Sequence, residues 1–256
     1  MRIVAFVLFS SLLVAQGPPA AAPKPPSTPR AGAPVDFTGT WVSIVTEDWR
    51  WRMTTPIKGD FASIPLNAEG RKLGRTWDPA ADEAAGFACK AYGAPGVMRI
   101  PGRVRVSWAD DNTLKIETDQ GQQTRLLHFN TKAVPAGTQA DWQGYSVANW
   151  EQPVRGEGPP QLGLGMTRRG TRGRSLEVVT TNLRSGYLRK NGVPYSDKAV
   201  VREFYDLSTE PDGSTWFVVT TIVEDPAYLT EPFVTSSNFK KERDAARFEP
   251  TPCSAR

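Results

Sequence analysis

Histidine and cysteine are scarce in this sequence. Its 256 residues include one histidine, His128, and two cysteines, Cys89 and Cys253. Protein zinc sites are usually built from several histidine or cysteine ligands, so the inventory argues against a structural or catalytic zinc. We therefore expect no bound metal.

The short motifs that mark common cofactor sites and hydrolase sites are also missing. The sequence has no Gly-x-x-x-x-Gly-Lys-Ser/Thr, no Gly-x-Gly-x-x-Gly after a strand and no Gly-x-Ser-x-Gly. Its carboxylate pairs, such as Glu47/Asp48 and Asp110/Asp111, are adjacent, and adjacent residues in a strand point to opposite faces. We expect no cofactor, and the sequence defines no glycosidase-type carboxylate pair.

There is little excess charge in the part of the chain that we expect to fold. The formal net charge is +4, but residues 1–30 contain three basic residues and no acidic residue, which leaves +1 for the remainder. Residues 155–174 hold five arginines and six glycines, an arrangement that favours a solvated loop or, alternatively, an anion-attracting rim over a cavity. With no nucleic-acid-binding signature elsewhere, we expect no nucleic acid partner.

The N-terminus has the layout of a secretory signal peptide. Arg2 precedes the apolar run 3–14, and small residues follow it, so we expect residues 1–22 to be a signal removed on export to the periplasm or the exterior. The run is too short for a permanent membrane span, and no cysteine follows it as a lipid anchor. Residues 23–35 are rich in proline and alanine and read as a disordered linker, and residues 36–256 as one domain.

Period-2 alternation of apolar and polar residues predicts an all-β, antiparallel fold. Residues 97–129 read as a β-meander, with turns at 109–113 and 119–122. Further strands are predicted in the regions 141–154, 176–181, 187–195, 199–207 and 215–223. Short helices are expected at 67–76 and 82–91, where Asn67 and Pro79 are start signals.

A Gly39-Thr40-Trp41 motif stands at the start of the first predicted strand. It resembles the opening motif of lipocalins and related calycin barrels, in which the tryptophan closes one barrel end. The resemblance implies a lipocalin-like barrel or a strongly curved sheet, and it transfers no ligand.

The two cysteines form an even pair in a chain expected to be exported. An oxidising compartment favours a Cys89–Cys253 disulfide, which would tie the segment before the meander to the C-terminus. The alternative is two unpaired thiols.

One extended strand over residues 41–52 would place Trp41, Trp49 and Trp51 on the same face. Such an aromatic face could form the wall of a ligand cavity, or it could be ordinary core and cross-strand packing.

The second hairpin of the meander leaves the orientation of two polar residues open. If residues 120–121 form a two-residue turn, Glu117 pairs with Thr124, Arg125 faces the apolar side and His128 faces the other. A turn longer by one residue reverses this assignment.

Two functional hypotheses follow, and a purely structural exported domain is a third. The first is a binding protein for a small, partly aromatic or apolar molecule, in which arginine side chains orient an anionic group. The second is a cofactor-independent isomerase, lyase or hydratase in which His128 moves protons. The candidate ligand or charge-stabilising residues are Trp49, Trp51, Arg125, Tyr187, Tyr195 and Glu203.

Overall fold

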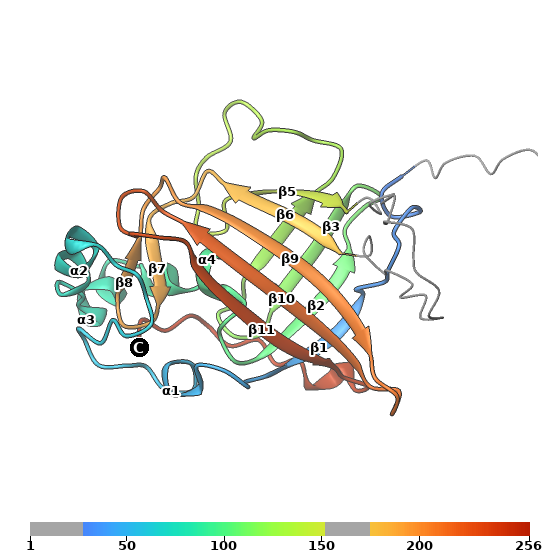
Figure 1. Cartoon of the computed structure of the whole chain (residues 1–256), viewed down its shortest axis with the longest axis horizontal. Helices are drawn as coiled ribbons and strands as arrows, with labels where there is room; N and C mark the ends of the chain where they lie inside the picture. The colour runs from blue at the N-terminus through green and yellow to red at the C-terminus, as the bar shows by residue number, and fades with distance from the viewer. Residues whose placement is uncertain (1–27, 152–174) are drawn as a thin grey trace, which may run out of the picture.

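The chain forms a closed nine-stranded β-barrel with a small cap at one end (Figure 1). The computed structural model describes residues 28–151 and 175–256. The barrel strands are β1 (Gly39–Ile44), β2 (Arg103–Trp108), β3 (Thr113–Thr118), β4 (Thr124–His128), β5 (Tyr145–Trp150), β6 (Leu176–Thr181), β9 (Val200–Thr209), β10 (Thr215–Glu224) and β11 (Phe233–Lys241). The predicted all-β class is confirmed.

The strand order around the barrel is β1-β11-β10-β9-β6-β5-β4-β3-β2. Closure comes from β1, which pairs with β2 on one side and with β11 on the other. Neighbouring strands are antiparallel except for the parallel pair β4 and β5. Closure removes the exposed sheet edges that could pair with another chain, although β4 and β5 are paired over only two residues each.

The cap consists of short helices and one hairpin, which lie at the left of Figure 1. We use the name cap for α1 (Trp49–Arg52), α2 (Ala68–Gly74), α3 (Pro79–Ala84), η1 (Ala88–Ala91), α4 (Ala94–Val97) and the hairpin of β7 (Gly186–Arg189) and β8 (Val193–Tyr195). A further short helix, η2 (Ala245–Arg247), follows β11. A second apolar cluster, which includes Leu188 and Tyr195 of the cap and Val201 and Phe233 of the barrel, packs the cap against the barrel.

Packed side chains fill the barrel interior. At the end away from the cap, Trp41 is fully buried, and its Nε1 donates to the Phe37 carbonyl at 2.9 Å. Phe37 and Phe217 are also buried there, with ring centroids 5.4 Å apart. At the cap end, Val97 and Met98, at the end of α4, belong to the same buried cluster. Aromatic side chains therefore close one end of the barrel and α4 closes the other.

The hairpin of β3 and β4 has the register of a two-residue turn. Glu117 pairs with Thr124 and Ile116 pairs with Arg125. Gly121 adopts φ 79°, and a Cβ there would lie 2.2 Å from Cδ1 of Tyr92, so glycine is required at this turn. Arg125 is 1% exposed and faces the interior, whereas His128 lies on the outer face.

Two predictions about the first part of the chain need correction. The single strand over residues 41–52 is wrong, because β1 ends at Ile44 and Asp48, at φ 52°, turns the chain into α1. A four-residue segment is too short for its alternation to distinguish a strand from a single helical turn. The helix predicted at 82–91 is divided into α3 and η1, separated by Gly86 at φ 75°. The predicted helix start signals are confirmed. The Asn67 side chain caps α2, and Pro79 is the first residue of α3, after the capping Asp78.

The Cys89–Cys253 disulfide is present and links η1 to the C-terminal segment. That segment runs back to the cap, and its Thr251 exchanges backbone hydrogen bonds with the turn between β3 and β4 at Asp119 and Gly121. The described part of the expected linker, residues 28–35, lies near the other barrel end, where Trp150 donates to the Pro29 carbonyl at 3.0 Å. The expected signal and the arginine-rich loop 155–174 lie outside the described residues.

Candidate functional site

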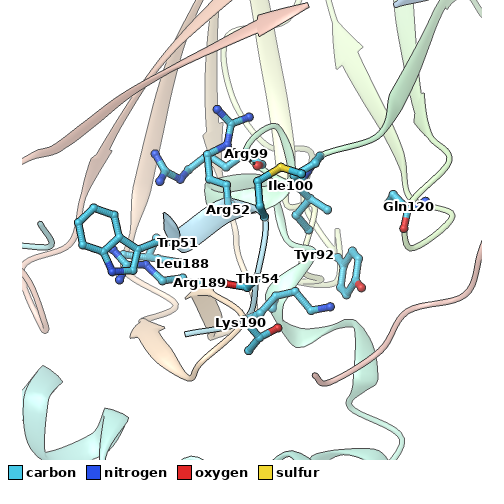
Figure 2. Close-up of a pocket in the computed structure, with 15 residues that line it drawn as sticks. Trp51, Arg52, Thr54, Tyr92, Arg99, Ile100, Gln120, Leu188, Arg189 and Lys190 are labelled. Carbon is cyan, nitrogen blue, oxygen red and sulfur yellow. Dashed lines mark hydrogen bonds between the residues drawn. The ribbon is translucent and has the colours of Figure 1, made fainter. Parts of the chain in front are cut away.

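A cleft of about 230 Å³ opens between the cap and the barrel (Figure 2). One side is formed by the end of α1 with the segment after it, residues 51–55, and by the end of β7, residues 188–190. The remaining lining comes from Ala91, Tyr92, Gly96, Arg99, Ile100, Pro101 and Gln120. All these segments meet at the mouth of a barrel whose interior is already filled, so the cleft is a better candidate for a ligand site than the barrel.

Two buried arginines lie next to each other in this cleft. Arg52 and Arg99 are each 8% exposed, and Nε of Arg52 donates to the backbone carbonyl of Arg99 at 2.8 Å. Nη2 of Arg99 donates to Asp48 at 2.8 Å, and the guanidinium group lies 5.5 Å from the ring centroid of Phe233 at the start of β11. In Figure 2 the two side chains lie together on the side of the cleft that faces the barrel strands.

Several hydrogen-bond donors of this pair are unused. Nη1 and Nη2 of Arg52 and Nη1 of Arg99 are buried and have no hydrogen-bond partner in the described part of the chain. Glu47 lies two residues before α1, and its buried Oε1 also lacks a partner, so it forms no hydrogen bond with Arg52 through that atom. Buried guanidinium donors are normally paired, because an uncompensated buried charge is costly.

Burial and the nearby positive charge in the cleft lower the pKa values of two of its arginines. Burial lowers the pKa of Arg52, and the nearby charge of Arg99 lowers it further, against the opposing effect of Glu47 and Asp48. Burial and Arg99 likewise lower the pKa of Arg189 to about 10. Burial and the charge of Arg99 thus disfavour the protonated forms of both Arg52 and Arg189.

Arg189 also organises the wall of the cleft. Its Nη2 donates to the Ala62 carbonyl at 2.8 Å, and its guanidinium group lies 5.4 Å from the ring centroid of Trp51. Trp51 in turn donates to Asp60 at 3.1 Å. The aromatic wall at Trp51 is therefore fixed from two sides.

The opposite rim is held by the C-terminal segment. The backbone nitrogen of Ser254 donates to the Tyr92 hydroxyl at 3.3 Å, and Nζ of Lys190 lies 5.4 Å from the Tyr92 ring centroid. Gln120 forms a bridge with Thr251 close to the disulfide. The disulfide thus anchors the segment that supports Tyr92 and Gln120.

Arg125 and Glu203, both predicted from the sequence, come together inside the barrel rather than in the cleft. Nη2 of Arg125 lies 2.6 Å from Oε2 of Glu203, and Nη1 lies 3.0 Å from Oε1. Both side chains are almost completely buried. Burial alone would lower the pKa of Arg125, but the carboxylate of Glu203 outweighs it and raises the pKa. Each charge is satisfied by the other, which indicates a structural pair.

The two predicted tyrosines lie in the cap, outside the cleft lining. The Tyr187 hydroxyl donates to Asp82 at 2.8 Å and accepts from Lys90 at 3.1 Å, and burial followed by Asp82 raises its pKa. Tyr195 is 1% exposed, and burial raises the pKa of its hydroxyl. Neither hydroxyl is poised to ionise near neutral pH.

His128 and Trp49 lie on surfaces that do not line the cleft. His128 stacks on Tyr145 on the outer face of the barrel, with ring centroids 4.6 Å apart, and burial lowers its pKa. Trp49 is 68% exposed. Of the residues predicted from the sequence for a ligand or catalytic site, Trp51 alone lines the cleft.

The sequence reasoning missed Arg52, Arg99 and Arg189. Each stands beside apolar or aromatic residues, in Trp51-Arg52, Met98-Arg99-Ile100 and Leu188-Arg189. An arginine directly next to an aromatic or apolar residue was the available signal, because burial of a cation demands a partner. The alternation of the supposed strand 41–52 instead placed Arg52 on the face opposite the tryptophans.

No protein-family model matches this chain, and no curated protein or solved structure does so either. Within residues 28–151 and 175–256, no helix is long and apolar enough to cross a membrane. Over the same residues, no group of three or more histidine, cysteine, aspartate or glutamate side chains is placed to hold a metal ion.

Proposed function

We propose that this chain is an exported small-molecule-binding protein whose ligand occupies the cleft between the cap and the barrel. The observation that carries the proposal is the cleft itself, which places the aromatic wall of Trp51 opposite Tyr92 and ends on arginines with unused donors. Ligand sites combine apolar or aromatic walls with a few polar groups that fix orientation. The cleft has that composition.

The size of the cleft points to a small ligand. Drug-sized molecules usually occupy pockets of about 300–1,000 Å³, and this cleft, at about 230 Å³, is smaller. A single aromatic ring or a short aliphatic chain with one polar group suits that space.

Export and kinship with lipocalins belong to the same proposal. The apolar run after Arg2 and the Cys89–Cys253 disulfide both support a periplasmic or secreted location. Gly39-Thr40-Trp41 and the closed barrel support a lipocalin-like origin. The cleft differs from the interior site that a ligand-holding barrel would offer.

The alternative of an acid/base enzyme receives less support. Such an enzyme needs His128 to share a cavity with the groups that stabilise charge. His128 instead lies on the outer face, while Arg125 and Glu203 face the interior.

A thermal-shift screen of small aromatic and aliphatic acids, amides and alcohols tests the binding proposal. A ligand at about 100 times its Kd stabilises the folded chain by about 2.7 kcal/mol. Thr55 is an exposed residue of the cleft wall, so Thr55→Trp should block the cleft and remove the shift. Ala136→Trp, on an exposed loop away from the cleft, should keep it. Ligands that still bind Thr55→Trp with full effect, or a screen without any ligand, would refute the proposal.

A further inference from the structure

We propose that the cleft recognises a carboxylate group and that Arg52 and Arg99 are the residues that bind it. This inference rests on the proposed function, because it assigns the charged group of a ligand held in that cleft. It begins with two arginine residues that are more than nine-tenths buried and carry three unpartnered nitrogens between them.

Nη1 and Nη2 of Arg52 have no partner and are closed to solvent in the ligand-free chain, so a carboxylate reaches them only when the cleft lining shifts. Nε of Arg52 is used by the Arg99 carbonyl at 2.8 Å, so the remaining donors are Nη1 and Nη2. Two parallel N–H groups of a guanidinium match the two oxygens of a carboxylate. Nη1 of Arg99 supplies a further donor from the adjacent side chain.

The position of Arg52 is fixed without a bound ligand. The Nε bond to the Arg99 carbonyl holds its guanidinium group, and the Asp48 bond and the Phe233 ring hold that of Arg99. Both side chains are therefore preorganised, which lowers the conformational entropy lost when an anion binds.

The surrounding charges favour a singly charged oxyanion. Arg52, Arg99 and Arg189 face the site from α1, the segment after α4 and β7, and Glu47 and Asp48 face it from the segment before α1. Asp48 is occupied by Arg99, but its charge and that of Glu47 remain. Three arginines and two carboxylates sum to a charge of +1, which one carboxylate neutralises, whereas a doubly charged phosphate would leave an uncompensated negative charge in a desolvated site. The ligand class is therefore a small carboxylic acid with an apolar or aromatic body against Trp51.

Sodium benzoate, benzamide and phenyl phosphate are matched probes for this inference. All three carry the same ring, and they differ in the charge and shape of the polar group. Calorimetric titration of the disulfide-bonded chain should show binding of benzoate and at least tenfold weaker binding of benzamide and phenyl phosphate. Equal affinity for benzoate and benzamide, lost in Thr55→Trp, would refute the carboxylate while leaving the proposed function standing. Tighter binding of phenyl phosphate would refute the preference for a single charge.

Arg52→Met is the variant that assigns the residue. Methionine keeps much of the apolar stem and removes the charge, so benzoate affinity should fall by about 10- to 150-fold, the range for a lost charged hydrogen bond. Because the unpartnered charge goes as well, the ligand-free variant should melt at or above the wild-type temperature. Arg50→Met, on the exposed face of the same helix, should leave benzoate affinity unchanged. If Arg52→Met binds benzoate as tightly as Arg50→Met does, the assignment of Arg52 is overturned, whatever its melting temperature.

Discussion

Arg125 of β4 and Glu203 of β9 form a two-point ion pair inside the barrel, with contacts of 2.6 and 3.0 Å. Thr180 and Tyr205 add weaker hydrogen bonds to the same guanidinium group, at 3.3 and 3.4 Å. The pair joins strands that are not neighbours in the barrel order. The ion pair therefore links β4 to β9 across the barrel interior.

Removing one member of this pair should destabilise the chain strongly. Arg125→Met or Glu203→Gln should lower the free energy of unfolding by about 3–5 kcal/mol, because each leaves a buried charge or its donors without a partner. The combined change Arg125→Met with Glu203→Leu should cost much less than the sum of the two single changes. Urea denaturation of the purified variants measures these values.

A surface pair on the same strand is the matched control. Arg202 of β9 contacts Glu177, and both side chains are partly exposed. Arg202→Met should change the free energy of unfolding by about 0–1 kcal/mol. A cost for Arg125→Met no larger than this would show that the buried pair does not have the assigned structural role.

The disulfide should be a major source of stability. Cys89 and Cys253 are separated by 164 residues, and closing so long a loop is worth about 5 kcal/mol in the chain-entropy model. The double variant Cys89→Ala with Cys253→Ala should lose stability of that order in urea denaturation. Mass spectrometry of alkylated native protein should find no free thiol, and two modified cysteines would contradict the bridge.

His128 should affect the pH dependence of stability and have no role in binding. Burial places its folded pKa below the usual value of 6.5, so protonation favours the unfolded chain. The contribution of His128 is present above about pH 6.5 and is lost as pH falls through the lower, folded pKa. His128→Gln should therefore lose less stability than the wild type between pH 7 and pH 5, with unchanged ligand affinity. A large loss of affinity would instead place His128 in the ligand site.

Much of the barrel could be predicted because its strands obey simple alternation. In β2, β3, β6, β9 and β10 the inward positions are mostly apolar, and turn residues separate consecutive strands. The register of β3 and β4 was narrowed to two possibilities, and the turn at Gly121 selects the one that buries Arg125.

The closing strand β11 escaped prediction for a physical reason. Its inward positions include Thr235 and Ser237 between Phe233 and Phe239, so the apolar alternation disappears in the middle of the strand. These small polar side chains face the same interior as Arg125 and Glu203. Because the inward residues in the middle of β11 are polar, its sequence lacks the apolar alternation by which a strand is recognised.

The cleft could not be predicted because its residues are far apart in the sequence. Arg52 and Arg99 are separated by 47 positions, and the Cys89–Cys253 link brings in the C-terminus. Each contributing segment is short and irregular, so no periodic pattern specifies where its side chains point. Only the three-dimensional packing of the cap on the barrel brings these groups together.

Backbone NMR with saturating benzoate tests most directly the claim that the ligand site is the cleft and not the barrel interior. We expect amide shift changes concentrated in the residues that line the cleft, which are 51–55, 91–92, 96, 99–100, 120 and 188–190. Residues at the far barrel end, such as Trp41 and Phe217, should not respond. Shift changes centred on those barrel residues or on His128, or no changes anywhere, would contradict it.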